Sequence, residues 1–218
     1  MNKEPLYMPG PKRPFDTVVL ADGLYPSSPV PLHILNTAYR VVCCDGAADT
    51  LLAHGRVPDA VVGDCDSVST EIRTRYIRRV YCNPDQETND LTKAVRYCVE
   101  KGYDRVAILG ATGKREDHTI GNVSLLASYA GETEDVCMAT DYGVFDAISA
   151  DTEFDSFPGQ QVSIFTLDPE TRVKVRGLRY IPPAGGMHSW WQGTLNECLT
   201  ETFTILTDRP AIVFRTYQ

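Results

Sequence analysis

Residues 41–67 read VVCCDGAADTLLAHGRVPDAVVGDCDS, and two short apolar runs in this stretch, VVCC and AVV, are each followed closely by carboxylates. Asp45 follows the first run, and Asp64 and Asp66 follow the second. A helical pattern lies between the runs, and apolar strands separated by helices form a parallel sheet that is covered on both faces. In such a sheet, ligands bind beyond the carboxyl ends of the strands. The stretch therefore predicts an α/β fold with three aspartates at its binding edge.

The same alternation continues along the chain to about residue 145. Strand-like runs lie at 17–20, 40–44, 60–62, 80–82, 106–109 and 136–139, and helical patterns lie at 47–54, 70–78, 89–100 and 121–129. Beyond that point the strand-like runs are separated by turn sequences such as FPG and DPE, which is typical of a small antiparallel β sandwich. These later runs lie at 154–166, 172–180, 202–206 and 211–216.

The pattern predicts three parts. Residues 1–14 contain four prolines and are expected to form a mobile arm. Residues 15–145 are expected to form an α/β domain with a Rossmann-like, mostly parallel sheet. Residues 146–218 are expected to form the antiparallel β-sandwich domain.

Composition limits the classes of partner. The chain has 218 residues, 43% of them apolar, and a net charge of −8. An acidic surface argues against a general binder of nucleic acid or of anionic membranes, because both would be repelled. The 7 cysteines include no C-x-x-C pair and are interpreted as buried, reduced thiols rather than zinc ligands or disulfides. With no secretory signal and no apolar run near the ~20 residues of a membrane helix, we expect a cytoplasmic location.

The three aspartates at the strand ends have two interpretations. In an extended stretch, Asp64 and Asp66 would point to the same side, and Asp45 would approach them from the neighbouring strand. Converging carboxylates raise one another's pKa unless a cation neutralises them, and oxygen ligands favour Mg²⁺, which usually arrives with substrate phosphates. The alternative is that the aspartates cap turns and helices. The occurrence of three at adjacent strand ends favours the metal.

Residues 83–98, NPDQETNDLTKAVRYC, contain a predicted helix start. Thr88 is the expected N-cap, which places Asp90 in the first turn and Lys93 one turn later on the same face. Lys93 could meet a phosphate there. The alternative is a solvated helix start in which acids favour the helix dipole.

Residues 108–126, ILGATGKREDHTIGNVSLL, run from an apolar strand through a glycine-rich turn into a helix. Gly110 and Gly113 permit close backbone approach, and the N–H groups of the turn could cradle a phosphate. Arg115 offers a fork of donors for phosphate oxygens. The spacing is not that of a Walker A loop. Asp117 and His118 then enter the helix, and a lone histidine there is interpreted as structural.

Residues 188–197, HSWWQGTLNE, place two tryptophans beside polar residues in the β domain. Core packing of a sandwich explains most such aromatics. The alternative is an aromatic platform for a flat, cationic or heteroaromatic ligand.

Taken together, these stretches resemble the thiamine pyrophosphokinase family. The resemblance implies an α/β nucleotide-binding domain followed by a β-sandwich domain that binds thiamine. It also implies a homodimer that transfers the diphosphate of ATP to the hydroxyl of thiamine, giving thiamine diphosphate and AMP. The motifs that carry it are CDGA (44–47), PDAVVGDCDS (58–67), DQETNDLTKA (85–94), GATGKREDHTIGN (110–122), GLRY (177–180) and GTLNE (193–197).

The resemblance also implies roles for individual residues. It assigns Mg²⁺ binding and positioning of the ATP phosphates to Asp45, Asp64, Asp66 and Asp90. The catalytic residues that it implies are Asp64, Asp66, Asp90 and Asp117. The substrate-binding residues that it implies are Gln86, Lys93, Thr112, Arg115, Tyr180 and Asn196, with Asn196 closing the pocket against the partner subunit.

The β-domain motifs depart from the family pattern. Tyr180 stands where the family often has the tryptophan that packs on thiamine, so either Tyr180 stacks or Trp190 or Trp191 supplies the surface. Leu195 replaces a serine, and Thr194 could supply the missing hydroxyl. Two other functions stay open: a Mg²⁺-dependent kinase that transfers the γ-phosphoryl group to another small alcohol, and a non-catalytic nucleotide or thiamine sensor.

Overall fold

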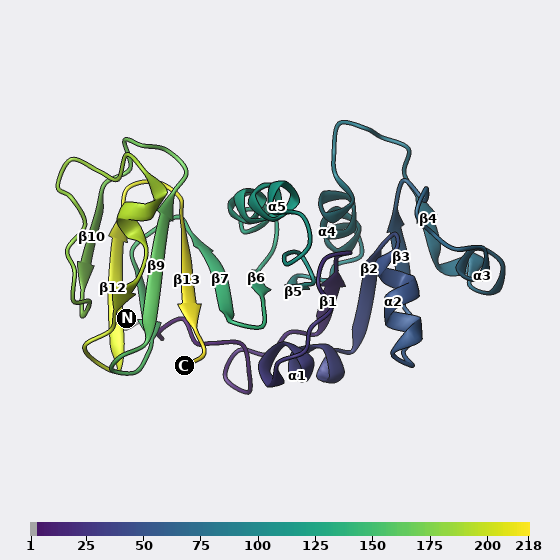
Figure 1. Ribbon diagram of the computed structural model, residues 1–218, viewed down its shortest axis with the longest axis horizontal. Helices are drawn as coiled ribbons and strands as arrows, with labels where there is room; N and C mark the ends of the chain where they lie inside the picture. Colours follow the sequence, from purple (N-terminus) through teal and green to yellow (C-terminus); the bar gives the residue numbers. More distant parts are fainter. Residues whose placement is uncertain (1–3) are drawn as a thin grey trace.

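The computed structural model describes residues 4–218, and one mixed sheet of ten strands runs through them (Figure 1). Half of this sheet is parallel, in the order β6-β5-β1-β2-β3-β4. Its strands are β1 (Thr17–Leu20), β2 (Arg40–Cys44), β3 (Ala60–Gly63), β4 (Val80–Cys82), β5 (Arg105–Leu109) and β6 (Asp135–Ala139). The predicted α/β architecture is confirmed, and each expected strand lies within one residue of its predicted bounds.

Helices cover both faces of the parallel half (Figure 1). Successive side chains of a strand point to opposite faces, so Val18 packs in one core cluster and Val19 in the other. The first cluster contains residues of α1 (Pro29–Thr37), α2 (Ala47–Ala53) and α3 (Thr70–Arg75), and the second contains residues of α4 (Asp90–Glu100) and α5 (Glu116–Tyr129).

Three helices, α1, α3 and α5, differ from the prediction. No helix was expected at α1, whose two prolines lie in its first turn, where a missing N–H breaks no helical hydrogen bond. Helix α5 begins at Glu116 rather than at 121, because two acids in its first turn favour the helix dipole. Helix α3 ends at Arg75 and is followed by the 3-10 turn η1 (Ile77–Arg79).

The C-terminal part consists of two facing antiparallel layers. Strands β7 (Gly143–Ile148), β9 (Gln161–Thr166), β11 (Asn196–Glu197) and β13 (Ala211–Thr216) extend the large sheet, and β8 (Thr152–Asp155), β10 (Val173–Arg176) and β12 (Thr202–Thr207) form a separate one. A third core cluster, which includes the stacked rings of Phe154 and Phe203, fills the space between them. Strand β7 was not predicted, and the single run expected at 154–166 divides into β8 and β9. Since the large sheet continues from β6 into β7, the domain division at residue 145 stays a proposal.

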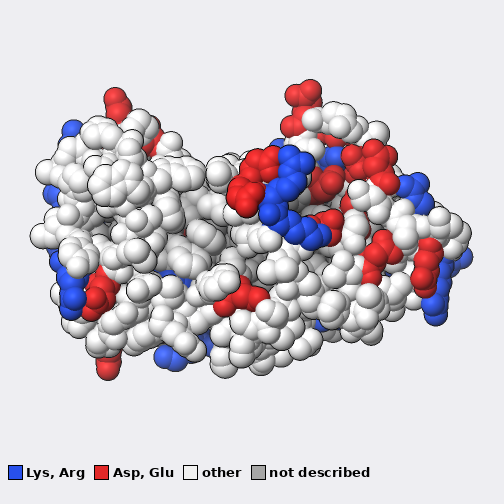
Figure 2. Space-filling model, viewed as in Figure 1, with Lys and Arg blue, Asp and Glu red and all other residues white. Residues whose placement is uncertain are grey.

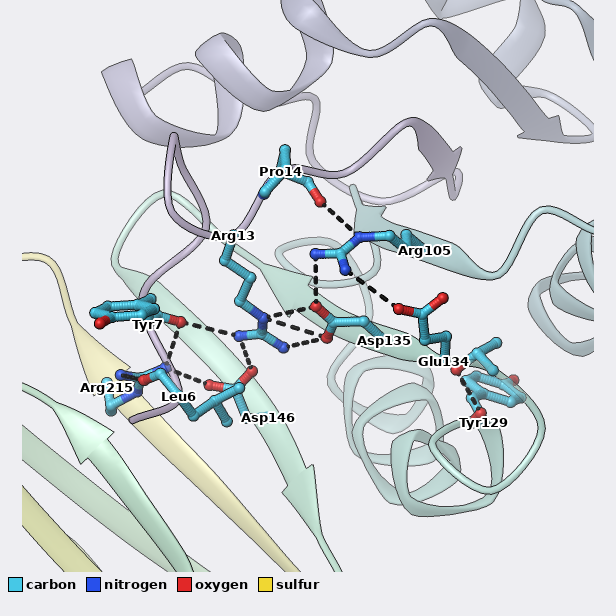
Figure 3. Close-up of polar contacts among 11 residues, drawn as sticks. Leu6, Tyr7, Arg13, Pro14, Arg105, Tyr129, Glu134, Asp135, Asp146 and Arg215 are labelled. Carbon is cyan, nitrogen blue, oxygen red and sulfur yellow. Dashed lines mark hydrogen bonds and ion pairs between the residues drawn. The ribbon is translucent and has the colours of Figure 1, made fainter. Parts of the chain in front are cut away.

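A buried ion network joins the first described residues to the rest of the chain (Figure 3). The Arg13 guanidinium lies 2.6 Å from Asp135 and 2.7 Å from Asp146, and Arg215 lies 2.8 Å from the second oxygen of Asp146. Residues 1–3 of the predicted arm lie outside the described residues. Residues 4–14 make these contacts, and the mobility of the arm stays a proposal.

The interpretation of the cysteines as reduced thiols is wrong for one pair, because Cys65 and Cys82 form a disulfide. Cys65 lies just beyond β3 and Cys82 ends β4, the parallel neighbour of β3. Their Cα atoms are 5.5 Å apart, an ordinary separation for a disulfide. The other five cysteines are free and buried. No helix in the described part of the chain has the length and apolarity to cross a membrane.

Candidate active site

A cavity of about 380 Å³ opens at the carboxyl ends of β1, β2 and β5. The segments that follow these strands and the first turns of α4 and α5 line it, with Asp45, Asp90, Thr112 and Arg115 among the lining residues. Charged side chains of both signs gather over the α/β part, whereas the C-terminal part is mostly uncharged on the same face (Figure 2). The cavity lies where an open parallel sheet is expected to bind a ligand.

Three of the predicted acids converge at this edge. One carboxylate oxygen from each of Asp45, Asp64 and Asp90 lies within 4.8 Å of the others. The backbone makes room for them, because a Cβ at Gly63 would lie 1.9 Å from Asp45 Oδ1. We call Asp45, Asp64 and Asp90 the acid cluster.

Asp66 lies outside the acid cluster and is exposed. We expected the stretch around Asp66 to be extended, but it is not, because Cys65 has a φ of +71°. The backbone N–H of Asp66 donates to Asp64 Oδ1 at 3.0 Å, so this residue supports the cluster through its main chain.

The acid cluster has only one close cation, Lys93, for its three carboxylates. Asp45 is only 4% exposed, and its Oδ2 atom has no hydrogen-bond partner. Burial, together with the charge of Asp90 and contact with Asp64, raises the pKa of Asp45 to about 6. Hydrogen bonds, first from the Asp66 N–H, lower the pKa of Asp64. A buried, unpaired carboxylate oxygen among other carboxylates suits a hard cation, so these residues could hold a metal ion.

Helix α4 supplies Asp90 and its neutralising lysine. The N-cap is Asn89, which accepts a hydrogen bond from the Thr92 N–H at 2.9 Å. The prediction of Thr88 as N-cap is wrong, because Thr88 donates its hydroxyl to Asp85. Lys93 is buried and its ammonium lies 3.2 Å from Asp90 Oδ1.

The glycine-rich turn forms the opposite wall. Gly110 and Gly113 have φ values of +65° and +91°, a backbone conformation that is sterically unfavourable for residues with a side chain. The Gly23 N–H donates to the Gly110 carbonyl at 2.6 Å, and a Cβ at Gly23 would lie 2.2 Å from the same oxygen. Thr112 and Arg115 reach the cavity from this turn.

Besides Asp64, Asp66 and Lys93, two further predicted residues of the α/β part, Asp117 and Gln86, do not line this cavity. Asp117 is exposed, and its contact with Arg115, 2.6 Å from oxygen to Nη2, lowers its pKa to about 2. Gln86 is exposed on the loop before α4 and donates to the Pro84 carbonyl. Their roles stay proposals.

Tyr180 and Asn196 line a second cavity, also of about 380 Å³, in the C-terminal part. The Asn196 side chain donates to the Tyr180 carbonyl at 2.7 Å and accepts from the Tyr180 N–H at 3.0 Å. Trp191 also lines this cavity and is exposed, whereas the Trp190 indole donates to the Thr166 carbonyl. The platform residues available here are therefore Tyr180 and Trp191.

Leu195 projects into the same second cavity. It is 67% exposed and has a φ of +56°, a conformation that is uncommon for a residue with a side chain. Its N–H donates to the Ser163 hydroxyl.

The two cavities lie far apart within one chain. Asn196 belongs to β11, and Asp45 follows β2, seven positions away in the strand order. At the usual spacing of about 4.8 Å between strands, this is on the order of 30 Å.

Comparison with known proteins decides the family. The sequence model described as the thiamin pyrophosphokinase catalytic domain matches residues 32–138, and the model of the thiamin pyrophosphokinase substrate-binding domain matches residues 143–214. The chain belongs to the thiamin pyrophosphokinase family. The resemblance inferred from the motifs is confirmed.

Individual members of the thiamin pyrophosphokinase family match over shorter stretches. Thiamin pyrophosphokinase 1 of Caenorhabditis elegans is 30% identical over 106 residues, which are 44% of this chain and 43% of that protein. Thiamine pyrophosphokinase of Bacillus subtilis is 36% identical over 87 residues, 38% and 40% of the two chains. The matches thus span less than half the length of these curated relatives.

Solved structures of the thiamin pyrophosphokinase family share the fold over nearly the whole chain. Thiamin pyrophosphokinase from Candida albicans has a TM-score of 0.75 at 15% identity, covering 98% of this chain and 96% of its own. A family protein from Enterococcus faecalis has a TM-score of 0.75 at 18% identity, covering 93% and 99%. At these identities the likeness shows the fold.

Some lining residues were missed in the sequence. Asn122 donates to the Ala111 carbonyl and accepts from Asn89, which ties α5 to the start of α4. It ends the GATGKREDHTIGN motif, whose asparagine could have been noticed. Asp22 and Lys114 also line the cavity, and nothing in their local sequence indicates that they meet.

Proposed function

We propose that this protein is a thiamine pyrophosphokinase that transfers the diphosphate of ATP to the hydroxyl of thiamine, releasing AMP. The observation that supports it most is the acid cluster facing a glycine-rich turn across one cavity. This arrangement suits a metal-bound polyphosphate, and family membership supplies the reaction. A cytoplasmic location remains part of the proposal.

The acid cluster fits Mg²⁺, and we assign Asp45, Asp64 and Asp90 as its ligands, with Asp66 as a further one. Bound there, Mg²⁺ would neutralise charge on the phosphates and make the attacked phosphorus more electrophilic. Lys93 fixes the Asp90 carboxylate, and the buried Asp45 supplies an oxygen that no protein group occupies.

The glycine-rich turn would orient the phosphates. Thr112 and Arg115 line the cavity, where the Arg115 guanidinium and the N–H groups of the turn would bind phosphate oxygens. Positioning and electrostatic stabilisation account for most of the rate enhancement of such transfers. Asp90 or Asp117 could accept the hydroxyl proton, although a pKa lowered to about 2 makes Asp117 a poor base. Attack at the β-phosphorus rests on the family alone.

We propose that Tyr180, Trp191 and Asn196 bind thiamine, and that the working enzyme is a homodimer. These residues lie about seven strands from the acid cluster of their own chain, too far for one thiamine to reach both. A second copy could bring its Tyr180 cavity to the first copy's acid cluster. The exposed apolar residues Ile181, Leu195 and Leu199 offer a contact surface for it.

The first test is to incubate the purified protein with ATP, Mg²⁺ and thiamine and to separate the nucleotides by chromatography. Equal amounts of AMP and thiamine diphosphate are expected. ADP instead would indicate a γ-phosphoryl kinase on the same fold. Saturable thiamine binding without turnover would indicate a sensor.

The dimer has its own test. Sedimentation should give twice the chain mass, and mixing an Asp64→Asn variant with a Tyr180→Ala variant should restore part of the activity that each lacks. A fully active monomer would contradict the shared site.

A further inference from the structure

Asp22 and Lys114 form an ion pair at the edge of the cavity to which the proposed function gives no role. The Lys114 ammonium lies 3.0 Å from Asp22 Oδ1. Asp22 belongs to the segment after β1 and Lys114 to the glycine-rich turn after β5, and both residues line the cavity. The pair therefore connects two loops that border the cavity.

This ion pair is weakly held. The side chains of Lys114 and Asp22 are 54% and 49% exposed, and exposed pairs of this kind add little to the stability of a fold. The backbones of the two loops are already joined, since the Leu24 N–H donates to the Thr112 carbonyl at 2.8 Å. The pair is thus not needed to hold the loops together, and its ammonium can exchange partners easily.

The other nearby cations are held by burial or by more hydrogen bonds. Lys93 is buried against Asp90 and does not line the cavity. Arg115 lines it and is exposed like Lys114, but it is bound through two nitrogens to Asp117, at 3.1 Å and 2.6 Å. Among the lysines and arginines that line the cavity in the described residues, Lys114 is the one held by a single hydrogen bond.

Asp22 also faces the segment that carries Asp45. A Cβ at Gly46 would lie 3.2 Å from Asp22 Oδ2, so this carboxylate borders the turn that follows β2. Its negative charge adds to that of Asp45 and Asp90 in the same cavity. An incoming polyphosphate would therefore be repelled by Asp22 and attracted by Lys114.

We propose that Lys114 is a phosphate-binding residue whose ammonium moves from Asp22 to the polyphosphate of a bound nucleoside triphosphate. Asp22 is its resting partner and competes with the nucleotide. This assignment rests on the proposed function, because it takes the cavity to bind the nucleotide. It has a distinctive consequence: removing Lys114 weakens binding, whereas removing the charge of Asp22 strengthens it.

The test is isothermal titration calorimetry with ATP and Mg²⁺, in the absence of thiamine. Lys114→Ala should raise Kd about tenfold, the usual effect of losing a hydrogen bond to a charged group. Asp22→Asn should lower Kd about two- to fivefold, in line with the small strength of an exposed pair. Lys114→Arg keeps the charge and should stay within about twofold of the parent.

Lys174→Ala is the matched control, because Lys174 is exposed on β10 and lies outside the cavity. It removes the same charge and should leave Kd unchanged. A pair that served only to hold the loops would give a different pattern, in which Asp22→Asn and Lys114→Ala weaken binding alike. That pattern, or an unchanged Kd in Lys114→Ala, would overturn the role of Lys114.

Turnover of ATP and thiamine by the parent protein is measured in parallel, which separates the two proposals. Opposite effects of the two variants on ATP binding, without formation of thiamine diphosphate, would support the role of Lys114 and refute the proposed function. Formation of thiamine diphosphate by the parent, together with an unchanged Kd for ATP in Lys114→Ala, would support the proposed function and refute the role of Lys114. Absence of ATP binding by the parent would overturn both.

Discussion

Two groups of buried or half-buried carboxylates in this chain have opposite surroundings. Asp146 lies between Arg13 and Arg215, at 2.7 Å and 2.8 Å, and both of its oxygens are paired (Figure 3). Asp45 lies beside two further carboxylates, Asp64 and Asp90, and one of its oxygens has no partner. The charge of Asp146 is neutralised by two arginines of the protein. The three carboxylates of the acid cluster have only Lys93 close to them, which is why we propose a cation there.

The pKa values of the two aspartates shift in opposite directions because their charged partners differ. Asp146 is 1% exposed and Asp45 is 4% exposed. Burial alone would raise the pKa of both, but the two arginines bring the pKa of Asp146 below its usual range. Burial and the Asp90 charge raise the pKa of Asp45 to about 6. A buried carboxylate that faces arginines, such as Asp146, therefore stabilises the fold. We interpret a buried carboxylate that faces other acids, such as Asp45, as part of a binding site.

The largest effect on stability is expected from Asp146→Asn. Removing one partner of a buried ion network leaves the arginines uncompensated and typically costs about 3–5 kcal/mol of unfolding free energy. Urea unfolding at pH 7 measures it. Glu134→Gln is the control, because Glu134 pairs with Arg105 at an exposed position and should change stability by less than about 1 kcal/mol.

The same variant also predicts a pH dependence. The folded-state pKa of Asp146 lies below its unfolded value, so its stabilising contribution is present above the ordinary aspartate range. That contribution is lost as the pH falls through the lowered pKa. The difference between parent and Asp146→Asn should therefore shrink on acidification, and a difference that grew would contradict the assignment.

In the acid cluster, Asp64→Asn should affect activity instead of stability. Losing one charged group that stabilises the transition state typically lowers kcat about 100- to 1,000-fold. The free energy of unfolding should stay close to that of the parent, because the hydrogen bonds that lower the pKa of Asp64 and the repulsion from its two acidic neighbours act in opposite directions. AMP formation and urea unfolding measure the two effects, and Glu153→Gln, an exposed acid on β8, is the control. Normal turnover would refute the metal assignment, and lost stability would make the residue structural.

The parallel half of the fold could be predicted because each strand is a short apolar run ended by a turn. Strand β2 is an example, since its pattern RVVCC gives four buried residues in succession. Helix α1 and strand β7 were missed because their sequences, PVPLHILNT and GVFDAI, carry weak periodicity and depend on tertiary contacts. Register across the sheets also depends on those contacts.

The positions of site residues could be predicted where those residues directly follow strands. They could not be predicted where the conformation of a loop sets the position. Asp45 and Asp64 follow β2 and β3, so their convergence could be expected from parallel pairing. Asp66 could not be placed, because the positive φ of Cys65 turns the chain in a way that alternation cannot reveal. The Cys65–Cys82 bond was missed because it depends on the register of β3 on β4, which the sequence alone does not reveal.

The disulfide extends the comparison, because a covalent bond rather than an ion pair ties down the backbone beside the acid cluster. Cys65 lies directly between Asp64 and Asp66, and its bond to Cys82 closes a loop with a sequence separation of 17. A Cys65→Ala, Cys82→Ala double variant should lose about 3 kcal/mol of stability, the effect of opening a loop of roughly 15 residues.

Urea unfolding with and without dithiothreitol measures this effect. The dithiol should destabilise the parent, because it reduces the disulfide to two thiols and is itself oxidised to a cyclic disulfide. The double variant is the matched control and should not respond. An equal response of both proteins would show that the bond does not stabilise the chain.

The smallest effect has the most informative sign. Asp45→Asn makes the same chemical change as Asp146→Asn at a position just as buried, but it should raise the unfolding free energy of the metal-free protein at pH 7. The amide keeps an oxygen to accept the hydrogen bond that the Cys65 N–H donates to Asp45 Oδ1 at 3.2 Å. Its NH₂ group replaces Oδ2, the carboxylate oxygen that has no hydrogen-bond partner, and can donate to the neighbouring acids. A gain of about 1 kcal/mol is expected, the usual contribution of one hydrogen bond to stability. Urea unfolding in EDTA measures it, and a loss comparable to that of Asp146→Asn would mean that both acids serve the fold and that Asp45 is not reserved for a cation.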